Sequence, residues 1–137
     1  MVVAADQLTK WWAIDRLSSG SIHIIGPLDL ELSRNSGSAF SLFQGDAAPL
    51  MVVAVVLIAG LAIVAWRSAT AGRAAAIGLI MGGALGNLSD RLFRGDHGAV
   101  VDFVALHFWP TFNVADSCIT VGCVLVLISF LRSPRNR

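Results

Sequence analysis

An uncharged run of 20 residues, positions 47–66, constrains the fold of this chain more than any other feature. A helix of about 20 apolar residues matches the hydrocarbon core of a bilayer, which is about 30 Å thick. The rest of the chain is also apolar, since hydrophobic residues make up 55% of the 137 residues and charged residues only 14%. An average soluble domain has about 25% charged residues. The composition therefore excludes a disordered chain and a typical water-soluble enzyme, and favours a single polytopic membrane domain.

Two shorter uncharged segments predict further helices. Residues 74–89 separate Arg73 from Asp90, and residues 117–131 separate Asp116 from Arg132. About 15 residues of helix extend about 22 Å, which is less than the hydrocarbon thickness. These helices can therefore cross a membrane only if Asp90 and Asp116 lie at or below the interface.

The N-terminal segment predicts the outer half of a first helix. Five residues precede Asp6, and Trp11 and Trp12 suit a membrane interface. A complete span would need about ten more apolar residues, so we expect a truncated start. A signal peptide fits poorly, because no basic region comes before the apolar stretch.

Residues 21–43 have a different pattern. SIHII and LDLELS alternate apolar and polar residues, which is typical of strands, and Gly26-Pro27 supplies a turn. We expect an all-α integral membrane protein with a small β-sheet between helices 1 and 2 at the outer membrane surface. One membrane domain, 1–137, would hold the sheet region 21–43 and four transmembrane helices at about 1–17, 47–66, 74–92 and 113–131.

Arginines indicate the orientation. Arg67 and Arg73 flank a short loop without acidic residues, and the tail carries Arg132, Arg135 and Arg137, also without acidic residues. The positive-inside rule places both segments in the cytoplasm, so both termini are inside. The sheet, the 90–116 connection and the carboxylates would then face outward.

Several polar residues converge on the outer end of the predicted bundle, where ionisable groups at membrane depth suggest a functional site. Each pair also has a purely structural interpretation. Asp6 and Lys10 are spaced as an i,i+4 ion pair. Asn113 and Asp116 resemble a capping pair at the start of a helix.

Two further positions complete the cluster. Asp90 and Arg91 at a helix end could simply stabilise the structure. Asp102 is harder to explain, because neither a cap nor a neighbouring cation accounts for a carboxylate within AVVDFVAL.

Other ligand classes find little support. The net charge of +1 argues against nucleic acid as a partner. The three histidines share no ligand spacing, so we expect no metal and no cofactor. Cys118 and Cys123 lie in an apolar run and are interpreted as packing residues.

Five sequence blocks occur in order along the chain: DQLTKWW, NSGSAF, GALGNLSDRLF, VVDF and FNVADS. Together they resemble the bacterial lipoprotein signal peptidase (signal peptidase II) family over nearly the whole chain. The resemblance implies an aspartic endopeptidase of the bacterial inner membrane with its active site toward the outer face. Its substrate would be a prolipoprotein whose cysteine carries diacylglycerol, and cleavage would occur just before that cysteine.

The resemblance also assigns residues. It implies that Asp102 of VVDF and Asp116 of FNVAD form the catalytic pair. Ser38 departs from the family pattern, in which alanine is common, and the helix before DQ is shorter than usual. The substrate-binding or supporting residues would be Asp6, Lys10, Asn35, Asn87, Asp90, Arg91 and Asn113.

Two carboxyl groups suit metal-free peptide hydrolysis, because one takes a proton from water while the other protonates the carbonyl oxygen. A proton- or ion-coupled carrier could use the same carboxylates, but it would need them near mid-membrane. A non-catalytic scaffold is a second alternative, in which glycines simply pack helices: Gly78, Gly82, Gly83 and Gly86. We expect a monomer whose partners are lipid and prolipoproteins.

Overall fold

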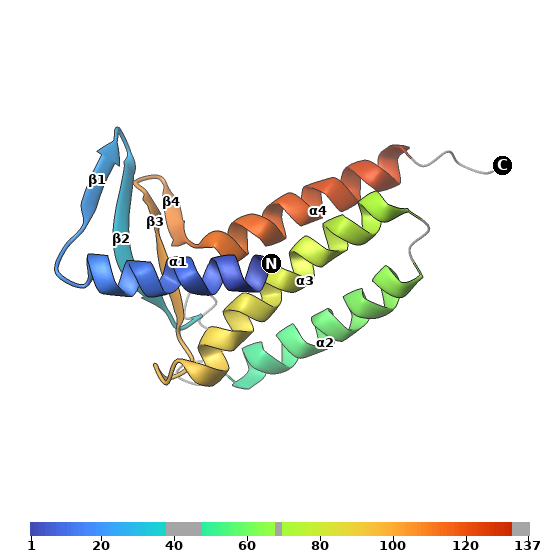
Figure 1. The fold of residues 1–137 in the computed structure, drawn as a ribbon, viewed down its shortest axis with the longest axis horizontal. Helices are drawn as coiled ribbons and strands as arrows, with labels where there is room; N and C mark the ends of the chain where they lie inside the picture. Colours follow the sequence, from blue (N-terminus) through green and yellow to red (C-terminus); the bar gives the residue numbers. More distant parts are fainter. Residues whose placement is uncertain (38–47, 68–69, 133–137) are drawn as a thin grey trace.

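The computed structural model describes residues 1–37, 48–67 and 70–132. The expected sheet residues 38–43, helix residue 47 and tail arginines Arg135 and Arg137 lie outside the described residues. Figure 1 shows a helical bundle with an antiparallel sheet at one end. The elements are α1 (Val2–Leu17), β1 (Ile22–Ile25), β2 (Leu28–Asn35), α2 (Ala48–Trp66), α3 (Ala71–Phe93), β3 (Val100–Leu106), β4 (Trp109–Phe112) and α4 (Val114–Arg132).

Helix α3 is the centre of the bundle, because it packs against each of the other three helices. Figure 1 shows α2, α3 and α4 extending away from the sheet, whereas α1 runs across the sheet and its N-terminal end lies beside α3. The C-terminal half of α1 packs on the sheet through a small core of Ala13, Leu17 and Phe103. This core fixes the sheet against the ends of the helices.

Helix α3 begins at Ala71, earlier than the expected position 74. The side chain of Thr70 caps the helix, since its Oγ1 accepts the backbone N–H of Arg73 at 3.3 Å. Arg73 therefore lies inside the first turn. The uncharged run after Arg73 predicted a start that is three residues too late. A helix can begin among polar residues before its apolar run starts.

Two of the described helices are long and apolar enough to cross a membrane, at residues 48–65 in α2 and over Val114–Arg132 in α4. Many of their apolar side chains are exposed, including Val56 at 64% and Leu127 at 59%. Exposed apolar helices of this length fit a lipid environment better than water.

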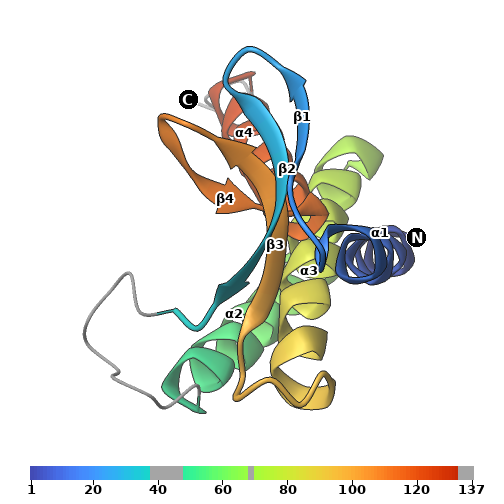
Figure 2. The same ribbon diagram turned by 90° about the vertical axis from the view of Figure 1, so that its left-hand side faces the viewer.

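The sheet is larger than the sequence predicted. Its strand order is β1-β2-β3-β4 with antiparallel neighbours, and Figure 2 shows its curvature. The sequence placed a small sheet between helices 1 and 2, and β1 and β2 do lie there. The expectation is incomplete, because β3 and β4 come from the connection between α3 and α4. The first four residues of β3 are all buried, so the strand shows no alternation. Pro110 in β4 weakens the strand signal further.

The register of β2 and β3 brings two of the candidate site residues together. Ser33 lies opposite Asp102, and Asn35 lies opposite Val100. Because side chains two residues apart share a face of a strand, Asn35 is a diagonal neighbour of Asp102 on the same face of the sheet.

Glycines allow α1 to approach α3 closely. A Cβ added at Gly82 would lie 2.7 Å from the Cβ of Val2, and one added at Gly86 would lie 2.5 Å from Oδ2 of Asp6. Gly78 differs, because a Cβ there would have nothing within 4 Å. The predicted packing role therefore holds for Gly82 and Gly86 against α1 and for Gly83 against α4, but not for Gly78.

We expect Gly83→Ala to destabilise the protein by about 1–3 kcal/mol, as overpacking typically does. An added Cβ would overlap the backbone carbonyl oxygen of Ala115 in the first turn of α4, which cannot rotate away. Thermal unfolding in detergent measures the effect. Gly78→Ala is the matched control on the same helix and should be neutral or slightly stabilising; an equal loss in both variants would contradict this packing.

Candidate active site

Polar residues from separate parts of the chain meet where the sheet joins the helices. Five of them are almost completely buried, with exposed fractions of at most 2%: Asp6, Lys10, Asp90, Asp102 and Asn113. Buried charges are costly unless they are paired and hydrogen-bonded, so the partners of these groups define the site. All nine residues singled out in the sequence lie in or beside this cluster.

Asn113 connects the two aspartates of the expected catalytic pair. Its Nδ2 donates to Oδ1 of Asp102 at 2.7 Å, and its backbone N–H donates to Oδ2 of Asp116 at 3.2 Å. Its Oδ1 in turn accepts the backbone N–H of Asp116 at 2.9 Å. The capping interpretation of Asn113 and Asp116 is thus confirmed, and the same cap places Asp116 beside the residue that holds Asp102.

Asn87 links Asp116 to the buried lysine. Its Nδ2 donates to Oδ1 of Asp116 at 2.8 Å. Its Oδ1 accepts from Nζ of Lys10 at 2.9 Å and from Nδ2 of Asn113 at 3.1 Å. With both polar atoms of its side chain engaged, Asn87 holds the Asp116 carboxylate in one orientation.

Lys10 forms ion pairs with two buried carboxylates. Its Nζ lies 2.9 Å from Oδ2 of Asp6 and 2.9 Å from Oδ2 of Asp90, and all three side chains are inaccessible. The predicted ion pair between Asp6 and Lys10 is therefore confirmed. The other oxygen of Asp6 accepts the backbone N–H of Ala115 at 3.0 Å, which ties α1 to the start of α4.

Asp90 joins α3 to the strand that carries Asp102. Its Oδ2 accepts the backbone N–H of Val101 at 3.0 Å. Its Oδ1 accepts from Gln7 at 3.0 Å and from Nε of Arg94 at 2.9 Å. Gln7 and Arg94 were not among the site residues expected from the sequence, although Arg94 stands at the i+4 position from Asp90 that favours an ion pair.

The environment of Asp102 makes its carboxyl group a weaker acid than an exposed aspartate. Burial raises the pKa of Asp102 to about 6. A hydrogen bond from Nδ2 of Asn35 at 3.0 Å opposes the shift, the negative charge of Asp116 adds to it, and the hydrogen bond from Asn113 opposes it. The carboxyl group can thus gain or lose a proton close to neutral pH.

Arg91 is the candidate residue with a free donor. Its Nε is buried and has no hydrogen-bond partner within the part of the chain that the structure describes. Its positive charge interacts with Asp116, Asp102 and Asp90. A guanidinium held by charge alone keeps N–H groups for another ligand.

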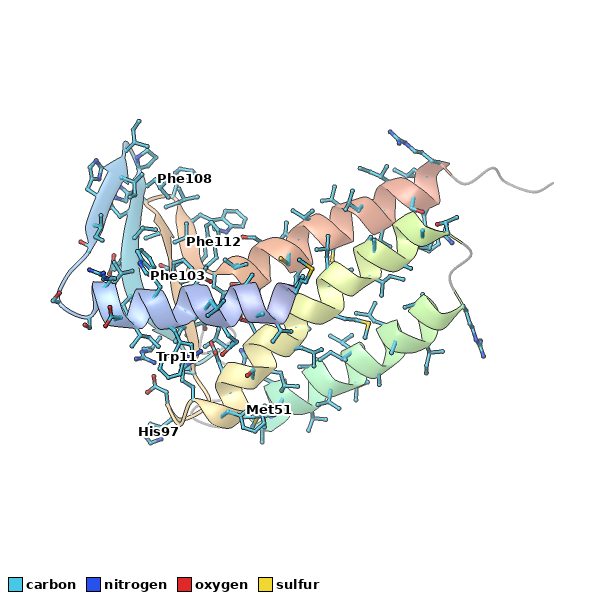
Figure 3. The ribbon with its side chains drawn as sticks, in the orientation of Figure 1. Trp11, Met51, His97, Phe103, Phe108 and Phe112 are labelled. Carbon is cyan, nitrogen blue, oxygen red and sulfur yellow. The ribbon has the colours of Figure 1, made fainter. Side chains whose placement is uncertain are left out.

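An apolar cavity of about 410 Å³ opens beside Asp116. The β3–β4 hairpin forms one wall, and Figure 3 shows Phe108 and Phe112 on the side of α4. Thr120 and Val121 of α4 form the opposite wall. A cavity of this size with one carboxylate at its edge suits an apolar ligand that carries a reactive polar group.

Among the described residues, no three His, Cys, Asp or Glu side chains are arranged to hold a metal ion. His23 and His107 contact the two oxygens of Asp29, at 2.6 and 3.0 Å. These contacts, the one with His107 first, lower the pKa of Asp29. The expectation of a site without metal or cofactor stays a prediction.

Two solved structures described as bacterial membrane enzymes share this fold. One aligns with a TM-score of 0.86 and 30% sequence identity, over 96% of this chain and 88% of that structure. The other aligns with a TM-score of 0.83 and 30% identity, over 99% and 86%. Together with the exposed apolar helices, this likeness supports a membrane location for the chain.

Sequence comparison gives the family. The model described as "Signal peptidase (SPase) II" matches residues 1–132. The lipoprotein signal peptidase of Syntrophomonas wolfei is 42% identical over 144 aligned positions, covering 99% of this chain and 94% of that protein. The lipoprotein signal peptidase of Rhodococcus jostii is 41% identical, covering 93% and 67%. The chain belongs to the signal peptidase II family.

Proposed function

We propose that this chain is an aspartic endopeptidase that removes signal peptides from diacylglyceryl-modified bacterial prolipoproteins, cutting before the lipidated cysteine. Membership of the signal peptidase II family supports the removal of lipoprotein signal peptides. One observation carries the aspartic mechanism: the side chain and backbone of Asn113 hydrogen-bond Asp102 and Asp116 at the same time.

The two carboxyl groups take opposite roles in this mechanism. Asp102, whose pKa burial raises to about 6, carries the proton and delivers it to the carbonyl oxygen of the scissile bond. Asp116, in the first turn of α4, accepts a proton from the attacking water. The tetrahedral gem-diol then collapses: Asp116 gives its proton to the amine of the cysteine and the C–N bond breaks. Asp102 takes back the hydroxyl proton as the new carboxyl group forms, which restores both aspartates.

The remaining candidate residues position this pair. Lys10, Asp6 and Asp90 form the buried ionic support beneath it, and Asn87 transmits that support to Asp116. The guanidinium of Arg91, whose charge interacts with Asp116 and Asp102, would bind the substrate backbone. These roles explain why charges that are expensive to bury occur at this end of the bundle.

The proposed topology has four membrane-spanning helices in the bacterial inner membrane, both termini inside, and the site at the outer face. Arg73 and Arg132 lie at the far ends of α3 and α4 from Asp90 and Asp116, in agreement with the positive-inside rule. The acyl chains of the substrate can then stay in the bilayer while the peptide reaches the site. The enzyme acts as a monomer.

In the Asn35→Ala variant, the alkaline limb of the pH–rate profile should move to higher pH. Activity requires protonated Asp102, so it falls as the pH rises through the pKa of Asp102. The hydrogen bond from Asn35 stabilises the ionised form, so its loss raises this pKa by about 0.5–1 unit. Initial rates between about pH 5 and 9 measure the shift, with Asp15→Asn as control, since Asp15 is exposed and pairs with Arg16. A limb that stays in place or moves to lower pH would contradict the assigned role.

Reconstituted protein tests the proposed function. We expect cleavage of a diacylglyceryl-modified prolipoprotein immediately before its cysteine, identified by mass spectrometry, and no cleavage of the unmodified precursor. Activity should persist in EDTA. Absence of cleavage together with proton flux across the liposome membrane would instead support the carrier alternative.

A further inference from the structure

A cleft beside α1 carries charges that the proposed cleavage reaction does not use. Its volume is about 420 Å³, and its walls come from α1, β2 and the segment that follows α3. Its charged and aromatic lining residues are Trp11, Arg34, Phe93, Arg94 and Asp96.

Two guanidinium groups and one carboxylate line this cleft. Arg34 forms an ion pair with Asp96, and the two side chains remain 41% and 36% exposed. Arg94 is only 11% exposed and is held from one side, with Nε and Nη2 bound to Asp90 and Nη2 also bound to Gln7. Its Nη1 forms no hydrogen bond or ion pair within the described part of the chain, so this group can donate to a ligand.

The charges around the cleft balance. Arg34 and Asp96 cancel each other, and so do the members of the buried cluster behind them. That cluster consists of Asp6, Lys10, Asp90 and Arg94. A zwitterionic ligand could therefore pair with Arg34 and Asp96 in place of their mutual ion pair, and the cleft would stay neutral.

Aromatic side chains border the cleft. Trp11 is 66% and Phe93 is 81% exposed, and Cζ of Arg94 lies 5.6 Å from the Trp11 ring centroid. Figure 3 shows Trp11 between α1 and the outer end of α3. Exposed aromatic rings beside arginines are typical of the membrane–water interface, where they contact lipid. A small soluble anion would gain nothing from them.

We infer that this cleft binds the headgroup of a zwitterionic aminophospholipid, with its phosphodiester on Arg34 and Arg94 and its ammonium group on Asp96. The planar guanidinium fork matches phosphate oxygens, and basic pockets between membrane helices bind lipid headgroups. When Arg34 turns from Asp96 to the phosphate, Asp96 loses its counter-ion. The ammonium group of the lipid then takes the place of Arg34 beside Asp96.

Native mass spectrometry of the full chain tests the inference, with phosphatidylethanolamine and phosphatidylglycerol supplied in equal amounts. We expect phosphatidylethanolamine to be retained preferentially. Arg34→Gln should lower its occupancy about fivefold, the equivalent of one basic residue at a lipid surface. Arg16→Gln is the matched control, since Arg16 forms an exposed pair with Asp15 outside the cleft.

A second variant separates specific loss from misfolding. Asp96→Asn removes the partner of the ammonium group and leaves a net positive cleft, so it should reverse the preference toward phosphatidylglycerol. A misfolded protein cannot gain such a preference. Equal retention of both lipids, or equal losses in Arg34→Gln and Arg16→Gln, would overturn the inference. Displacement of lipid by millimolar inorganic phosphate would also overturn it, because the ligand would then be a free anion. Occupancy is measured without substrate and is independent of cleavage.

Discussion

Asp102→Asn and Asp116→Asn should each reduce prolipoprotein cleavage by at least about a thousandfold, because each removes one of the two proton-transfer groups. Both variants should remain folded. The Asp102 carboxylate pays a desolvation cost in its buried position, and a neutral amide of the same shape avoids that cost. Cleavage of a diacylated substrate and thermal unfolding, measured on the same preparations, test the two statements.

Asn87→Asp is not a suitable control for this experiment, since it would add a carboxylate to the site. Asp15→Asn is suitable, because Asp15 is 78% exposed and pairs only with Arg16 among the described residues. It should leave cleavage and unfolding unchanged. Near-normal turnover by either Asp102→Asn or Asp116→Asn would refute the assignment of that residue.

Asp90→Asn should have the opposite effect, with lower stability and retained chemistry. The carboxylate balances Lys10 and Arg94 and accepts the backbone N–H of Val101. Removing one member of a buried ionic network typically costs about 3–5 kcal/mol. We therefore expect a markedly lower unfolding temperature and folded yield, while the folded fraction keeps measurable cleavage.

The amide oxygen that Asp90→Asn introduces can still accept a hydrogen bond, so the fold should survive in part. Asp15→Asn again gives the reference, since exposed ion pairs contribute little. A variant that is as stable as the parent would contradict the supporting role of Asp90. If the Asp90→Asn variant were stable but inactive, Asp90 would take a direct part in the cleavage reaction.

Much of the site could be predicted from the sequence because local spacing determines several of its contacts. The i,i+4 spacing of Asp6 and Lys10 and the i,i+3 spacing of Asn113 and Asp116 correspond to contacts that the structure contains. The clustering of polar residues at one end of apolar helices indicated where they meet. Which residues perform the chemistry rests on the family resemblance and stays a prediction.

The sequence was least informative where tertiary packing hides the pattern. Strand β3 is buried on both faces, so Asp102 stood in an apolar run that resembled no strand. Its neighbour Asn35 comes from a different part of the chain and meets it only through the register of β2 and β3. Likewise, Gln7 joins the Asp90 network across 83 positions of sequence, which no local pattern can indicate.

The most direct test of the central claim is the cleavage rate per folded molecule for Asp102→Asn and Asp90→Asn, assayed side by side on a diacylated prolipoprotein. Thermal unfolding in the same detergent supplies the folded fraction of each preparation. The account predicts a stable Asp102→Asn protein without turnover and a less stable Asp90→Asn protein that still cleaves. A stable but inactive Asp90→Asn protein, together with an Asp102→Asn protein that still cleaves, would contradict it and make Asp90 the catalytic partner of Asp116.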